Sequence, residues 1–157
     1  MYVTDYIRFS VVACGTFLAA AVLAGNVSAQ PPSADPAGVW IDHTGQGAVE
    51  IAPCGNRLCG RVVWLKDPEH KSRSGKRICG AQILGDLRKE GARAWGEGWI
   101  YNPEDEERFS AAIELAGANT LKVTGYVGIR FLGETFTWTR ATGTLERCAG
   151  DVGASAR

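Results

Sequence analysis

The chain has 157 residues, of which 45% are hydrophobic and 22% are charged, and its 17 basic and 17 acidic side chains cancel. This composition is typical of a globular domain and excludes collagen, a coiled coil and a disordered chain. The balanced charge also argues against nucleic acid as a partner, because binding to phosphates requires an excess of basic side chains.

Residues 1–29 have the features of a signal peptide. Arg8 supplies a positive charge, residues 9–25 are mostly apolar, and Ala29 is a small residue ahead of a cleavage point at Gln30. A retained membrane anchor is one alternative, although the apolar stretch is short for a bilayer. Lipid attachment at Cys14 is another, although the apolar run continues beyond it. We expect a periplasmic or secreted protein with no stable membrane anchor after cleavage.

Removal of the leader would leave Cys54, Cys59, Cys79 and Cys148. An even number of cysteines in an oxidising compartment predicts two disulfides. Cys54 and Cys59 flank a Gly-Asn turn between two strand-like segments, so they would face one another across a hairpin at disulfide distance. Cys79 then pairs with Cys148 by elimination. Zinc is the alternative for the close pair, but its spacing is wider than usual and no second close pair follows.

The remaining chain is expected to form one domain. Residues 30–37 contain three prolines and predict an extended lead-in, residues 38–148 the domain, and residues 149–157 a flexible tail. Apolar and polar side chains alternate with the period of a strand in residues 48–53, 108–115, 121–125 and 135–140, and residues 38–40 and 58–65 are also strand-like. Residues 81–87 are expected to form a helical turn or two at most. Short strands separated by turns predict an all-β antiparallel sandwich or up-and-down barrel.

The first and last predicted strands carry a pair of side chains that would meet if the barrel closes. Closure brings these strands together and removes exposed sheet edges. Arg140 would then lie over Trp40 in a cation–π contact, so both residues are assigned a structural role.

A series of motifs identifies a family that this chain resembles. The motifs are Gly38-Val39-Trp40, Val49-Glu50-Ile51, Cys54-Gly55 with Leu58-Cys59-Gly60-Arg61-Val62-Val63-Trp64-Leu65, Cys79-Gly80, Ile83-Leu84, Trp95 with Gly98, Asn102-Pro103-Glu104-Asp105, Gly125-Tyr126-Val127-Gly128 and Thr137-Trp138-Thr139-Arg140. In this order they resemble the small exported bacterial proteins called domain of unknown function 2147, over residues 38–140. The resemblance implies a secreted or periplasmic barrel similar to lipocalin and fatty-acid-binding folds, with no established activity to transfer. The sequence departs from the pattern at Glu106, where the family usually has a turn glycine, and at Phe109, where it usually has tyrosine.

No combination of residues specifies a reaction, so we expect no enzyme, no cofactor and no metal. His43 and His70 are the only histidines, and each is interpreted as a solvated turn or loop residue. Residues 105–107 are acidic, but they lack the pattern of a calcium loop. The basic residues in 67–76 are interpreted as a solvated loop, with a phosphate site as the alternative.

Aromatic side chains are the best candidates for lining a ligand cavity, above all Trp99, Tyr101 and Tyr126. Gly96 and Gly98 leave space beside them. Our first hypothesis is a module that binds a small apolar or amphipathic ligand inside the barrel. The alternative is an envelope protein with a filled core, which binds another envelope protein through residues 67–76 and 104–107.

Overall fold

The computed structural model describes residues 35–149. The predicted leader, most of the lead-in and the tail beyond residue 149 lie outside the described residues. Within the described range the elements are β1 (Gly38–Ile41), β2 (Gly47–Cys54), β3 (Arg57–Leu65), β4 (Gln82–Lys89), β5 (Ala94–Asn102), β6 (Glu107–Gly117), β7 (Thr120–Tyr126), the 3-10 helix η1 (Arg130–Leu132) and β8 (Glu134–Arg140).

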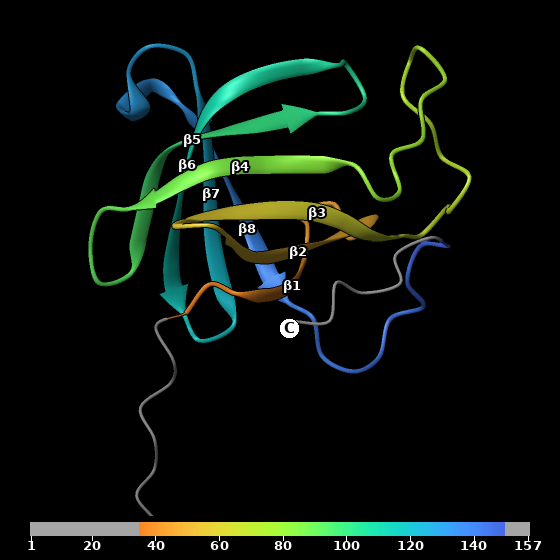
Figure 1. Ribbon diagram of the computed structural model, residues 1–157, viewed down its shortest axis with the longest axis horizontal. Helices are drawn as coiled ribbons and strands as arrows, with labels where there is room; N and C mark the ends of the chain where they lie inside the picture. The colour runs from red at the N-terminus through yellow and green to blue at the C-terminus, as the bar shows by residue number, and fades with distance from the viewer. Residues whose placement is uncertain (1–34, 150–157) are drawn as a thin grey trace, which may run out of the picture. The chain divides into compact units, whose positions relative to one another are not determined.

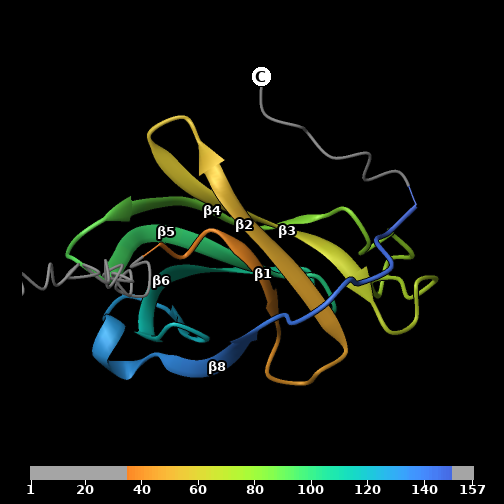
Figure 2. The same ribbon diagram turned by 90° about the horizontal axis from the view of Figure 1, so that it is seen from below.

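The strands form a closed antiparallel barrel in sequence order, as predicted (Figure 1). Each strand pairs with the next, and β1, β2 and β3 lie side by side in Figure 2. Pairing of β1 with β8 closes the barrel through Trp40 opposite Arg140 and Ile41 opposite Thr139. The predicted fold class is therefore confirmed.

The contact between Arg140 and Trp40 lies at this closing seam. The guanidinium carbon of Arg140 is 4.1 Å from the centre of the Trp40 ring. Trp40 is fully buried, and its indole nitrogen donates a hydrogen bond of 2.8 Å to the carbonyl of Pro36. The guanidinium also donates hydrogen bonds to the carbonyls of Ala37 and Ala118, both at 2.9 Å. One side chain therefore connects β8, the start of β1 and the β6–β7 turn.

An up-and-down barrel has two ends, because successive connections emerge on opposite sides. We call the end formed by the β1–β2, β3–β4, β5–β6 and β7–β8 connections the open end, and the other the closed end. Leu87, Leu115 and Leu121 are buried toward the closed end, together with Trp40. Side chains therefore fill this half of the barrel.

Both disulfides are present with the pairing expected from the sequence. Cys54 and Cys59 join β2 and β3 across their turn, with their Cα atoms 5.8 Å apart. Cys79 in the β3–β4 connection is bonded to Cys148, with their Cα atoms 5.7 Å apart. The backbone N–H of Cys148 donates to the carbonyl of Val63 at 2.8 Å, so the segment after β8 lies against β3.

The expectation of a helical turn in residues 81–87 is wrong, since these residues belong largely to β4. Leu84 and Leu87 are both fully buried although they are three positions apart, a spacing that is typical of a helix. The reason is Asp86, whose φ of 57° lies in the left-handed region and interrupts the strand alternation. Glu97 in the neighbouring β5 has a φ of 54°, at the point where the β5–β6 register shifts. These irregularities have the character of β-bulges, which conceal the period of two.

Candidate functional site

The open half of the barrel contains a cavity of about 890 Å³. Its walls come from β2, β3, β5, β6, β7 and β8, and all four connections of the open end contribute residues to it. The up-and-down topology explains this arrangement, because it gathers these connections around a single mouth.

The floor of the cavity is apolar. Val49, Val62, Ile78 and Trp138 line it and also belong to the buried core, each with at most 4% of its surface exposed. Phe109 adds an aromatic side chain to the wall. The apolar part of a ligand would therefore contact buried apolar side chains, and this contact favours its transfer from water into the cavity.

The mouth of the cavity is acidic. The lining includes Asp42 after β1, Asp67 after β3, and Glu134 at the start of β8. The β5–β6 turn and the start of β6 add Glu104, Asp105 and Glu107. We call these six carboxylates the acidic rim.

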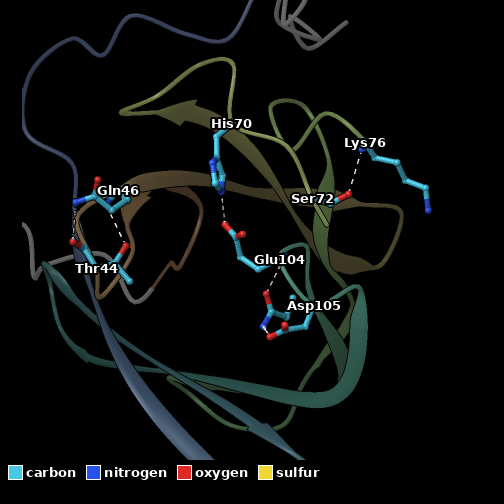
Figure 3. Close-up of polar contacts among 8 residues, drawn as sticks. Thr44, Gln46, His70, Ser72, Lys76, Glu104 and Asp105 are labelled. Carbon is cyan, nitrogen blue, oxygen red and sulfur yellow. Dashed lines mark hydrogen bonds and ion pairs between the residues drawn. The ribbon is translucent and has the colours of Figure 1, made fainter. Parts of the chain in front are cut away.

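One side of the mouth is built by contacts between the β3–β4 connection and the β5–β6 turn. The Nε2 atom of His70 lies 2.6 Å from a carboxylate oxygen of Glu104, and Figure 3 shows the two side chains pointing toward one another. Arg73 forms an ion pair of 2.7 Å with Asp105. The loop 67–76 and the acidic turn 104–107, which the alternative hypothesis makes the partner-binding surfaces, are therefore bound to each other.

Glu106 completes this contact. Its carboxylate accepts hydrogen bonds from the hydroxyls of Ser72, at 2.7 Å, and Ser74, and lies 3.6 Å from Nζ of Lys76. The hydrogen bonds from Ser74 and then Ser72 lower the pKa of Glu106 below its usual value, because they stabilise the ionised form. The φ of Glu106 is 59°, in the left-handed region that glycine adopts most readily.

The three predicted cavity residues have different positions. Tyr101 and Tyr126 line the cavity, whereas Trp99 does not. The indole nitrogen of Trp99 donates a hydrogen bond of 2.8 Å to Asp86, and the Arg108 guanidinium lies 4.0 Å from its ring centre. A Cβ atom placed on Gly85 would collide with this indole, so the missing side chain makes room for it. The assignment of Trp99 to the cavity is therefore corrected, and this residue belongs to the outer wall.

The structure also shows where the histidines and the cysteines considered for zinc lie. His43 lines the cavity and stacks on Phe136, with ring centres 4.3 Å apart, whereas His70 pairs with Glu104. Cys54 and Cys59, considered for zinc, are bonded to each other. Within residues 35–149, no group of three or more histidine, cysteine or acidic side chains is arranged to hold a metal ion.

The acidic rim is the main feature that the sequence analysis missed. Asp42 and Glu134 are ordinary turn residues when the sequence is read along the chain. They line the same cavity only because the barrel topology brings the β1–β2 and β7–β8 connections to the open end. The sequence does contain one indication of the rim, because acidic residues lie next to a predicted strand end at each of these connections.

No helix in the described part of the chain has the length and apolar character needed to cross a bilayer. The family model described as "Uncharacterized protein conserved in bacteria (DUF2147)" matches residues 38–140. Among solved structures, the chain is similar to one described as "Protein HP1028 from the human pathogen Helicobacter pylori belongs to the lipocalin family". The TM-score is 0.57 at 20% sequence identity, over 70% of this chain and 85% of that one, which supports a lipocalin-like fold. No curated protein matches this chain.

Proposed function

Since this chain belongs to the DUF2147 family of uncharacterised bacterial proteins, whose name assigns no activity, we propose a function from the barrel itself. The protein binds a small apolar or amphipathic ligand in its open-end cavity, without catalysis, in the periplasm or after secretion. The observation that carries this proposal is the cavity of about 890 Å³ with an apolar floor. Its volume lies within the range of roughly 300–1,000 Å³ that is usual for sites of small molecules.

The division of the barrel into a filled half and an open half supports ligand binding rather than a core that is filled throughout. Leu87, Leu115 and Leu121 fill the closed half and give the walls a rigid base. The floor residues Val49 and Val62 face the cavity from β2 and β3. A rigid barrel that is open at one end can accept a ligand without unfolding, which limits the entropic cost of binding.

The disulfides support the proposed location. Cys54–Cys59 and Cys79–Cys148 involve every cysteine of the described residues. Disulfides persist in the periplasm and outside the cell, and are rare in the reducing cytoplasm. Together with the predicted leader, they support export.

A native mass spectrum of protein exported through a bacterial periplasm tests the proposal. We expect a chain that begins at Gln30 and lacks four hydrogens because of its two disulfides. We also expect an additional mass that leaves on collisional activation, or binding of an apolar fluorophore where the ligand is lost in purification. A bare protein that binds no apolar fluorophore would contradict ligand binding, and a mass that retains the leader would contradict export.

A second candidate function rests on exposed apolar side chains beside the mouth. Val127, Ile129, Phe131 and Leu132 in the β7–β8 connection are 64–93% exposed. Such a patch is typical of a contact with another protein, here an envelope protein. A photo-crosslinker at position 131 would then capture a defined partner in cells, whereas one at the exposed Glu146 would not. Equal capture at both positions would argue against this function.

A further inference from the structure

We propose that the cavity selects a cationic amphiphile, a molecule with an apolar tail and a protonated amine as its head. This inference rests on the proposed ligand-binding function and specifies the chemistry of the ligand. The apolar floor would receive the tail, and the acidic rim would face the amine.

The charge of the lining is one-sided. The acidic rim contributes Asp42, Asp67, Glu104, Asp105, Glu107 and Glu134, whereas no lysine or arginine of the described residues lines the cavity. The chain as a whole has equal numbers of acidic and basic side chains. The excess of carboxylates is therefore a local property of the mouth.

Basic groups near the mouth offset only part of this charge. Arg73 pairs with Asp105, and His70 offsets Glu104 when it is protonated. Lys66 and Lys71 are neighbours of Asp67 and His70 in the sequence, but their side chains are not part of the lining.

Four rim carboxylates remain without a cationic partner. Within residues 35–149, no ion pair involves Asp42, Asp67, Glu107 or Glu134. Asp42 accepts hydrogen bonds from the backbone and hydroxyl of Thr44, and Asp67 accepts one from the backbone of Glu69. These contacts fix the two carboxylates in place and leave their charge unbalanced.

An ammonium head matches this arrangement. It carries three hydrogen-bond donors and no acceptor, whereas ionised carboxylates only accept. A fatty acid would place its own carboxylate among like charges, which opposes binding. An uncharged head would neither gain nor lose from the rim charge. The order of affinity expected for a common tail is therefore amine, then alcohol, then acid.

The test is displacement of a neutral apolar fluorophore, N-phenylnaphthylamine, from the full mature protein by decylamine, decanol and decanoate at neutral pH. Because several exposed carboxylates act together through a high dielectric, we expect decylamine to bind about tenfold more tightly than decanoate, with decanol between them. The difference should shrink as salt is added. Tighter or equal binding of decanoate would overturn the selection of a cation and leave ligand binding intact. No displacement by any of the three would contradict the proposed binding function as well.

Variants assign the selectivity to the rim. Glu107→Gln combined with Glu134→Gln should weaken decylamine binding about fivefold and leave decanol binding unchanged, because several weak exposed charge contacts are lost and the apolar contacts remain. Glu146→Gln removes the same kind of exposed carboxylate away from the cavity lining and should change neither affinity. Decylamine binding that is unchanged in the double variant would overturn the role of the rim.

Discussion

Replacement of Arg140 by alanine should weaken the seam that closes the barrel. The seam between β1 and β8 has two paired positions, Trp40 with Arg140 and Ile41 with Thr139, so side-chain contacts matter more there than at longer strand pairs. The Arg140 guanidinium lies over the Trp40 ring at 4.1 Å and donates hydrogen bonds to three backbone carbonyls.

The loss of stability expected for Arg140→Ala follows from these contacts. A cation–π contact contributes about 0.5–2 kcal/mol, and the hydrogen bonds of a partly exposed guanidinium add about 0.5–1 kcal/mol each. Allowing for water that replaces some of these bonds, we expect Arg140→Ala to lower the free energy of unfolding by about 2–4 kcal/mol. Arg140→Lys keeps a charge near the ring but loses the planar donors, so it should cost about 1–2 kcal/mol.

Urea unfolding with the disulfides intact, followed by tryptophan fluorescence, measures these values. Arg61→Ala is the matched control, because Arg61 donates one exposed hydrogen bond, to the carbonyl of Gly80. The control should cost less than about 1 kcal/mol. An Arg140→Ala protein as stable as Arg61→Ala would refute the idea that Arg140 stabilises the seam.

Changes at the two disulfides and at Glu106 test other parts of the structure. The Cys79–Cys148 disulfide joins residues 69 positions apart, and its loss should lower the free energy of unfolding by about 4 kcal/mol. The Cys54–Cys59 disulfide joins residues 5 positions apart, and its loss should lower the same quantity by about 2 kcal/mol. Calorimetry of the paired serine variants measures both, and equal costs would contradict the loop-entropy argument. Glu106→Gly should be about 1 kcal/mol more stable than Glu106→Ala in urea, because both lose the carboxylate but only alanine retains the left-handed strain. The lowered pKa of Glu106 further predicts that its contacts stabilise the protein at neutral pH and are lost as the pH falls through that pKa, so the wild-type advantage over Glu106→Ala should shrink in acid.

The sequence predicts the fold where alternation is regular. Apart from the small residue Ala112, residues 108–115 alternate between apolar and polar side chains, and the strand β6 includes all of them. The prediction failed for β4, because left-handed Asp86 places Leu84 and Leu87 on the same buried side at helical spacing. A single residue that breaks the alternation is invisible to a periodicity argument.

The candidate site was less predictable than the fold. Trp99 is a large aromatic residue of the kind that lines cavities. Whether its side chain faces the inside or the outside of the barrel depends on the register shift between Trp95 and Gly98. The acidic rim depends on which connections share an end of the barrel, and so requires the complete topology. Tyr101 and Tyr126 were candidates because aromatic side chains are frequent in the walls of binding sites, and both line the cavity.

Blocking the open-end cavity shows whether this cavity holds a ligand. Gly125 lines the cavity, and a Cβ atom there would make an ordinary contact of 3.4 Å with Ile100, so Gly125→Leu should fold and project into the cavity. Thr124→Leu places a similar side chain at the adjacent position, which is not part of the lining. In a titration with N-phenylnaphthylamine, we expect saturable binding to the wild type and to Thr124→Leu, and at least about tenfold weaker binding to Gly125→Leu. Equal binding by all three proteins, or none by the wild type, would contradict this expectation.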